Sequence, residues 1–293
     1  MSQRRTACSP RIADGSLSVA DDGCAVVPGF LSEPQLSRIN HELDVAFAAP
    51  SFNTPFFSTV RDRHIRTVTS PTLLRSINVL EFAVDVAQVL ERLSPTFLRR
   101  DYYVMNIDVY AEVGGSQALE WHTDNTSGMI SAQVYVRGGG PTSGALSYMR
   151  GTHRREFHVD HMLDARRVEE FSSTIVSCGG APGALAVFDP MGFHARAVCR
   201  EERRIIRVEF LRRDVPYANL KSFFPSHLFS PRVIGEIGLF TNYDPDRPYV
   251  LKHAGEPLEH WRPRPLTARL LTATALLWVA MPRLARLFRR RRT

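Results

Sequence analysis

The spacing of hydrophobic residues changes along the chain, and in the first part it is typical of helices. Ser32-Glu33-Pro34-Gln35 is a capping-box pattern with proline in the first turn, and it marks a helix start. Apolar residues then recur at helical spacing, which predicts one apolar face on the helix. A second helical region spans residues 71–93. We expect both helices to be packing elements, because neither carries a ligand-binding pattern. The residues of the first apolar face are Leu36, Ile39, Leu43 and Phe47.

From Tyr102 the period changes to two, which predicts β-strands. Glycine-rich turns such as Gly138-Gly139-Gly140-Pro141 separate the strand candidates, and Gly23–Leu31 predicts an earlier short buried strand with a turn. Several short strands with turn signals favour a sandwich or barrel. We therefore expect a mainly β fold, a double-stranded β-helix (jelly roll, cupin-like) with the N-terminal helices packed outside. The strand candidates are 102–109, 130–136, 173–177, 183–188 and 204–211.

Length and composition indicate a globular protein, since the 293 residues are 44% hydrophobic and 23% charged. We expect a disordered lead (residues 1–20), one jelly-roll domain (21–262) and an apolar, Arg-rich tail (263–293). The four cysteines form no C-x-x-C pair, which disfavours a zinc site or a disulfide framework and favours reduced thiols. Arg4-Arg5 is not followed by an apolar run, so no signal peptide is predicted and we expect a cytoplasmic location.

The positive charge of the chain belongs to its tail. Nine Arg and no Asp, Glu or Lys follow His260, so removing their nine charges from the net +7 leaves residues 1–260 at −2. A general nucleic-acid binder needs a basic face, and we therefore expect no nucleic-acid partner.

The tail also contains an uncharged apolar run, Leu270–Met281, bounded by Arg269 and Arg283. Its twelve residues are fewer than the roughly 20 that cross a bilayer. One interpretation is an interfacial helix in which residues 266–293 contact an anionic membrane, placing the protein peripherally at the inner face. The other is a helix packed on the domain or on a second copy. The sequence leaves the oligomeric state open.

Two stretches carry candidate metal chemistry: Trp121-His122-Thr123-Asp124 and Phe188–His194. A His and a carboxylate two residues apart project from one side of an extended strand. A distant second histidine, brought back by the fold, would complete the two-histidine, one-carboxylate set of non-heme Fe(II) oxygenases. The metal candidates are thus His122, Asp124 and His194. The competing interpretation is a hydrogen-bonded surface pair and an unrelated core histidine.

Five motifs in order resemble the phytanoyl-CoA dioxygenase family of Fe(II)/2-oxoglutarate oxygenases. They are the opening strand, turn and helix (23–44), the W-H-x-D motif (121–124), the G-A-L…G-T-H segment (144–153), the G-A-x-x-x-F-D…H segment (183–194) and the R-R-I-I-R-V strand (203–208). The resemblance covers roughly residues 23–212. Two departures stand out: Cys199 occupies a position where the family usually has Asn, and the P-G-S-H segment is Arg-Gly-Thr-His here.

The resemblance implies a dioxygenase whose catalytic iron is held by His122, Asp124 and His194. It implies Fe(II), 2-oxoglutarate and O₂ as cofactor and cosubstrates, with succinate and CO₂ released. The expected reaction is hydroxylation of an unactivated C–H bond in a small or lipid-like molecule, with desaturation left open. Related halogenating enzymes have Gly or Ala in place of Asp124, so the retained carboxylate disfavours halogenation.

An arginine is expected to bind the far carboxylate of 2-oxoglutarate, because its planar guanidinium matches a carboxylate in two hydrogen bonds. The candidates are Arg203 and Arg204; the resemblance favours Arg203, and only one face of the strand can line the pocket. Trp121 has two interpretations: it lines the 2-oxoglutarate pocket, or it packs against other side chains beside a buried strand.

A basic cluster before the β-region has two interpretations, a solvated loop or a site for an anionic substrate group. Its members are Arg61, Arg63, His64 and Arg66. The alternative to an enzyme is a non-catalytic jelly-roll binding protein tethered to a membrane by the tail.

Overall fold

The computed structural model describes residues 11–12, 17–48, 65–68, 74, 76–112, 119–155, 158, 160–214 and 228–240. Only the backbone is described for 11–12, 46–48 and 65–68. All of these residues belong to one compact unit, formed by Met1–Val215 and Ser222–Thr241. The expectations for the tail lie outside the described residues, as do those for Arg61, Arg63 and His64; of Arg66 only the backbone is described.

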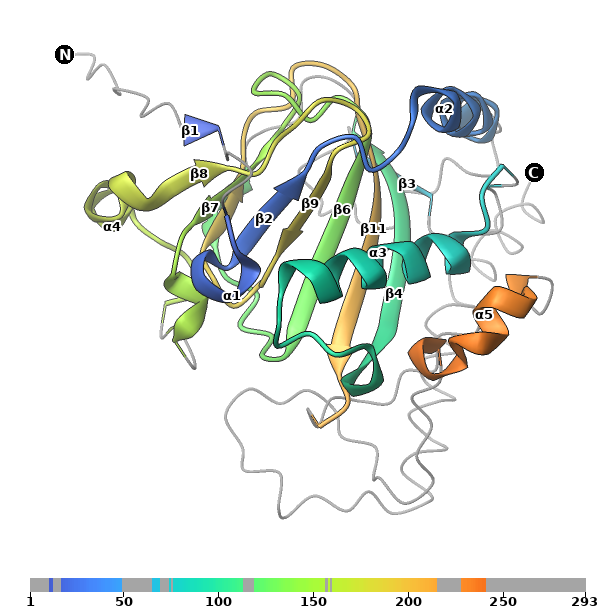
Figure 1. The fold of residues 1–293 in the computed structure, drawn as a ribbon. Coiled ribbons are helices and arrows are strands. Elements are labelled where there is room, and N and C mark those ends of the chain that lie inside the picture. Colours follow the sequence, from blue (N-terminus) through green and yellow to red (C-terminus); the bar gives the residue numbers. More distant parts are fainter. Residues whose placement is uncertain are drawn as a thin grey trace, which may run out of the picture. The chain divides into compact units, whose positions relative to one another are not determined.

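Two β-sheets form the centre of this unit (Figure 1). The larger has the order β2-β9-β6-β11-β4-β3 and the smaller the order β1-β8-β7-β10-β5. All pairings are antiparallel except that of β1 with β8. The strands of the larger sheet are β2 (Cys24–Val27), β9 (Leu185–Phe188), β6 (Met129–Arg137), β11 (Arg203–Arg212), β4 (Tyr102–Glu112) and β3 (Ile65–Val68). Those of the smaller are β1 (Arg11–Ile12), β8 (Ile175–Ser177), β7 (Leu146–Met149), β10 (His194–Arg196) and β5 (Leu119–His122).

Helices α2 (Glu33–Ala48) and α3 (Val79–Leu93) pack against the outer face of the larger sheet, where α3 crosses β6, β11 and β4 (Figure 1). The predicted apolar face of α2 is buried through Leu36, Ile39 and Leu43. Helix α3 begins later than the helical region predicted from residue 71, because Asn78 caps it by accepting hydrogen bonds from the backbone N–H groups of Leu80 and Glu81. The remaining helices are α1 (Val19–Asp22), α4 (Ala165–Glu170) and α5 (Pro231–Gly235), with short 3-10 turns at 99–101, 152–154, 172–174 and 237–240.

Strand β11 contributes to two hydrophobic cores, one on each of its faces. Its residues Ile206, Val208 and Phe210 join the core beneath the helices. Ile205 points the other way, into a second core between the sheets with Tyr135, Tyr148 and Phe188. Because side chains alternate along a strand, Arg203, Arg207 and Glu209 share the inner face with Ile205.

The predicted jelly-roll class is confirmed. Every strand predicted from the alternating pattern is present within a few residues of its predicted bounds. The described cysteines Cys24, Cys178 and Cys199 are buried free thiols, as expected. In the part of the chain described here, no helix has both the length and the apolar character needed to cross a membrane.

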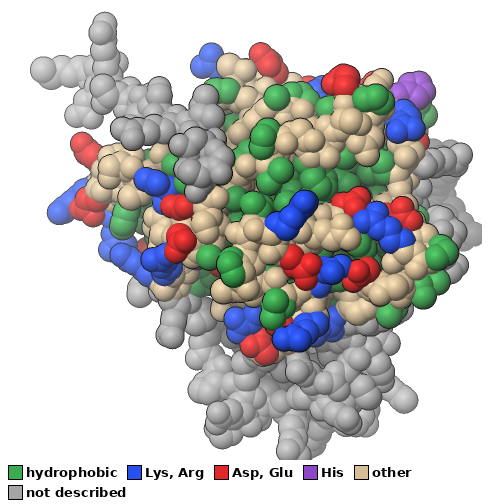
Figure 2. Space-filling view, in the orientation of Figure 1, with side chains coloured by type: hydrophobic (Ala, Val, Ile, Leu, Met, Phe, Trp, Pro, Cys, Tyr) green, Lys and Arg blue, Asp and Glu red, His purple; other side chains and the backbone are tan. Residues whose placement is uncertain are grey.

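Charges of both signs are mixed on the molecular face that carries α3 (Figure 2). Ion pairs such as Arg99–Glu91, with 2.7 Å between Nε and Oε2, and Arg232–Asp85 contribute to this mixture.

Candidate metal centre

Strand pairing brings the two histidines of the predicted site together. Strands β5 and β10 are antiparallel neighbours, and their register places His122 directly opposite His194. The two ring centroids lie 4.3 Å apart. The distal histidine therefore reaches the W-H-T-D motif through a sheet contact that no local pattern specifies.

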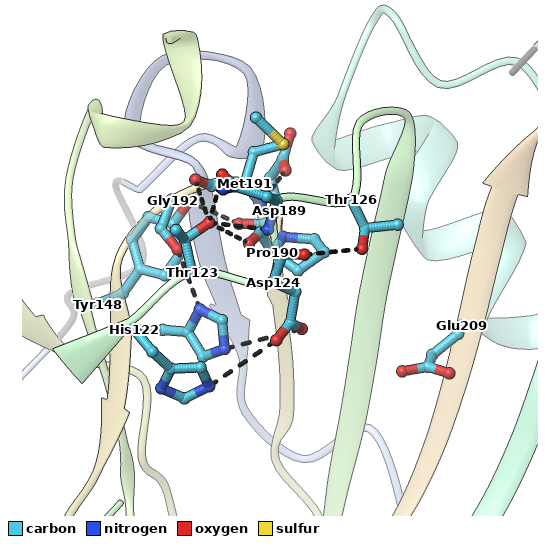
Figure 3. A network of polar contacts seen from close by, with 12 residues as sticks. His122, Thr123, Asp124, Thr126, Tyr148, Asp189, Pro190, Met191, Gly192 and Glu209 are labelled. Carbon is cyan, nitrogen blue, oxygen red and sulfur yellow. Dashed lines mark hydrogen bonds and ion pairs between the residues drawn. The ribbon is translucent and has the colours of Figure 1, made fainter. Parts of the chain in front are cut away.

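Asp124 completes the group from a loop. Strand β5 ends at His122, so Asp124 is not held by the strand alternation that the sequence suggested. Instead its backbone N–H donates to Pro190 O at 3.0 Å. The carboxylate oxygens lie 3.8 Å from His122 Nε2 and 4.0 Å from His194 Nε2 (Figure 3). A turn with positive φ at Asn125 (46°) follows directly.

Both imidazoles are oriented for metal binding. His122 Nδ1 lies 2.8 Å from Glu120 O and His194 Nδ1 lies 3.0 Å from Gly192 O. A carbonyl only accepts hydrogen bonds, so each Nδ1 carries a proton, and in the neutral imidazole it is Nε2 that offers its lone pair to a metal. Burial lowers the pKa of His194 to about 4, which keeps this ring neutral near pH 7. Candidate ligand atoms from His122, Asp124 and His194 all lie within 4.8 Å of one another, a set of two nitrogens and one oxygen that suits Fe(II).

Hydrogen bonds hold the W-H-T-D segment and the loop before His194 against each other and against neighbouring segments. The buried Thr123 hydroxyl donates to Met191 O at 2.8 Å, and the Thr123 N–H donates to His161 O at 3.0 Å. Tyr148 donates from its hydroxyl to Asp189 O at 2.8 Å (Figure 3). Thr123, between the two proposed ligands in sequence, thus positions Asp124 relative to the loop that carries His194.

We expect Thr123→Val to weaken metal binding by about 10- to 100-fold, the range for loss of a hydrogen-bonded support of a ligand. The valine keeps the branched shape and removes the link to Met191 O. Anaerobic Fe(II) titration measures the effect. Thr174→Val is the matched control, because the Thr174 hydroxyl also donates to a backbone carbonyl (Phe171 O, 2.8 Å) but in the short turn before β8. Equal losses in the two variants would contradict a specific role for Thr123.

The two candidate arginines lie on opposite faces of β11. Arg204 points to the outer face, where its Nη2 lies 2.6 Å from Asp44 on α2. Arg203 is 4% exposed and lies on the inner face, with its Nη2 2.8 Å from Glu112 Oε2 and its Nη1 bonded to Gly144 O. Arg196 pairs with the other oxygen of Glu112. The structure therefore brings Arg203, and not Arg204, to the interior between the sheets.

The remaining candidates lie elsewhere. Trp121 packs with Met149, Leu163 and Phe193, and alternation along β5 directs it away from the His122 side.

The interior polar residues that the sequence interpretation missed are Asn106, Asp108, Glu112, Arg196, Arg207 and Glu209. A local signal existed for two of them: charged and apolar residues alternate over 206–209, which places Arg207 and Glu209 on one polar face of an otherwise buried strand.

Solved structures with a similar fold include two non-heme α-ketoglutarate-dependent enzymes from nogalamycin biosynthesis and EctD from S. alaskensis in its apoform. The epimerase SnoN has 15% identity and a TM-score of 0.54, over 66% of this chain and 80% of that one. EctD has 18% identity and a TM-score of 0.52, over 70% and 84%. The carbocyclase SnoK has 16% identity and a TM-score of 0.51, over 71% and 89%. At these identities the likeness establishes the shared fold. Comparison with curated proteins found no match.

The family model described as phytanoyl-CoA dioxygenase (PhyH) matches residues 19–197, more than half of the chain. The match begins at α1, contains the W-H-T-D motif and ends just after β10. The predicted family is thereby confirmed. The chain belongs to the phytanoyl-CoA dioxygenase family and is a 2-oxoglutarate-dependent oxygenase.

Proposed function

We propose that this oxygenase uses Fe(II), 2-oxoglutarate and O₂ to hydroxylate an unactivated C–H bond of a small or lipid-like molecule, with release of succinate and CO₂. The observation that carries the proposal is the convergence of two oriented imidazoles and one carboxylate within 4.8 Å. Similar structures include an epimerase and a carbocyclase, so the fold alone does not select the outcome. Asp124 supports hydroxylation over halogenation, because its carboxylate occupies the position that a halide would need.

The donor set fits the metal. Two imidazoles and one carboxylate would hold Fe(II) and leave further coordination positions for the cosubstrates. When bound, iron supplies the oxygen chemistry, and the chain holds and shields the reactants. His122 and His194 present Nε2 while the carbonyls of Glu120 and Gly192 fix the rings. Asp124 is 49% exposed at its side chain, so the ligand group faces a side that small molecules can reach.

The inner arginine fits the far carboxylate of 2-oxoglutarate. Arg196 follows His194 by two residues on β10, so it extends on the same side about 7 Å further along the strand. Arg196 and Arg203 meet at Glu112, which places Arg203 toward the same end of the interior. Arg203 Nε is a buried N–H without a hydrogen-bond partner among the described residues. Such a donor is costly to leave unsatisfied and is available to an anion.

Succinate formation tests the proposed function. We expect the Fe(II)-loaded protein to bind 2-oxoglutarate without O₂ and, with O₂, to form succinate faster in the presence of its substrate. Mass spectrometry should then show one added oxygen atom in the product. His194→Ala supplies the background rate. Succinate formation no faster than this background would contradict the proposal and favour the non-catalytic binding protein.

A further inference from the structure

A polar wall faces the metal ligands across the interior. It consists of Asn106 and Asp108 from β4 with Arg207 and Glu209 from β11. The strand register places Glu209 opposite Asn106 and Arg207 opposite Asp108. Figure 3 shows the Glu209 side chain extending from β11 toward Asp124 and the histidines. The wall therefore borders the space in which a substrate would meet the metal.

Within this wall one oxygen of Asp108 makes two short contacts. Arg207 Nη2 lies 2.6 Å from Asp108 Oδ2, and Asn106 Nδ2 donates to the same oxygen at 2.8 Å. These are short, charge-assisted contacts. The Asp108 carboxylate and the Arg207 guanidinium thus form a close ion pair, and Asn106 fixes their positions.

Glu209 has no comparable partner. Its carboxylate lies 3.4 Å from Arg207 Nη1 and 3.5 Å from Asn106 Nδ2, both beyond the usual hydrogen-bond range. The side chain is only 13% exposed. Burial raises the pKa of the Glu209 carboxyl, as expected for a carboxylate with few donors around it. A largely buried carboxylate with only long contacts is costly unless a ligand supplies a donor.

The charges of the loaded site leave one carboxylate in excess. A bound divalent metal would be balanced by Asp124 and one carboxylate of 2-oxoglutarate. The far carboxylate is balanced by Arg203, and Glu112 forms its second ion pair with Arg196. Asp108 is ion-paired with Arg207. Because Arg207 is also ion-paired with Glu209 at 3.4 Å, one negative charge in excess is shared by Asp108 and Glu209, and Glu209 makes the longer contact.

We propose that Glu209 binds a protonated amine of the substrate and so selects amine-bearing small molecules for oxidation. This inference rests on the proposed oxygenase function and specifies its substrate class. The amine on Glu209 would anchor the substrate on the wall of the larger sheet, with a nearby C–H bond directed at the metal ligands of the opposite sheet.

The test uses the full chain loaded with Fe(II), and three variants. Glu209→Gln removes the charge at nearly constant shape, Glu209→Asp keeps the charge on a shorter side chain, and Glu169→Gln removes an exposed carboxylate on α4 as the matched control. The probes are small-molecule extracts of the source cells, separated at neutral pH by cation- and anion-exchange resins. Anaerobic 2-oxoglutarate binding and substrate-stimulated succinate are both measured.

We expect stimulation by the fraction retained on the cation exchanger, and its loss after the amines in that fraction are acetylated. Glu209→Gln should require about 10- to 100-fold more of that fraction for equal stimulation, as for loss of a hydrogen bond to a charged group. Its 2-oxoglutarate binding should match that of the parent. Glu209→Asp should need an amount of the fraction between those needed by the parent and by Glu209→Gln. Glu169→Gln should respond like the parent.

Several results would overturn the amine assignment: stimulation confined to the other fractions, persistence after acetylation, an unchanged response of Glu209→Gln, or a parent that binds 2-oxoglutarate but responds to no fraction. A parent that does not bind 2-oxoglutarate would instead overturn the proposed function itself. The two failures are therefore distinguishable.

Discussion

Fe(II) binding is expected to collapse when His122, Asp124 or His194 is replaced by alanine. Each substitution removes one of three converging ligand atoms. The loss should exceed the roughly 10- to 100-fold that follows removal of a ligand's hydrogen-bond partner. Anaerobic calorimetric titration with Fe(II) measures it, and 2-oxoglutarate-dependent succinate should fall to background in all three variants.

The three variants should differ in stability. His194 is 6% exposed and packs 5.1 Å from the Phe188 ring centroid, so His194→Ala leaves a cavity and should lower the melting temperature. The Asp124 side chain is 49% exposed, and Asp124→Ala should melt close to the parent. His41→Ala, an exposed histidine on α2, controls for loss of an imidazole. If all three ligand variants bind Fe(II) like the parent, the triad assignment is wrong.

Replacing Arg203 by methionine is expected to weaken 2-oxoglutarate binding by roughly 2–5 kcal/mol, the range for removing one partner of a buried charge pair. Methionine keeps much of the side-chain length, and Arg196 still neutralises Glu112. Arg204→Met should have a smaller effect on binding, because Arg204 pairs with Asp44 and Glu202 on the outer face. Titration of the Fe(II)-loaded protein without O₂ gives both values.

Pyruvate provides the matched ligand control for Arg203. It has the chelating end of 2-oxoglutarate without the far carboxylate, so Arg203→Met should leave its weak binding unchanged. An equal loss for both ligands would indicate damage to the metal site. A larger loss in Arg204→Met than in Arg203→Met would mean that Arg204 is the inward residue and that the β11 register is shifted by one.

Local patterns were sufficient for most elements of the fold. The apolar spacing of Leu36, Ile39 and Leu43 marks the buried face of α2 because a helix repeats every 3.6 residues. Alternation over 204–211 marks β11 because strand side chains repeat every two. Strands β1, β3, β5, β7 and β10 were not predicted as separate elements. Length alone does not account for this, because β8 and β9, with three and four residues, lie within predicted strand candidates.

The sequence by itself determined the family and the types of residue that could hold a metal. It also indicated that Arg203 and Arg204, in the strand after His194, lie on opposite faces of that strand. These properties belong to residue identity and short-range spacing. Only the tertiary structure decided that Arg203 faces inward, that Trp121 packs, and that Asp124 is held by Pro190 O from a loop. It also decided the partners of Glu112 and left Glu209 with long contacts only. Partnerships of this kind join strands far apart in sequence, and their energy comes from burial and pairing across the sheets, which no local period encodes.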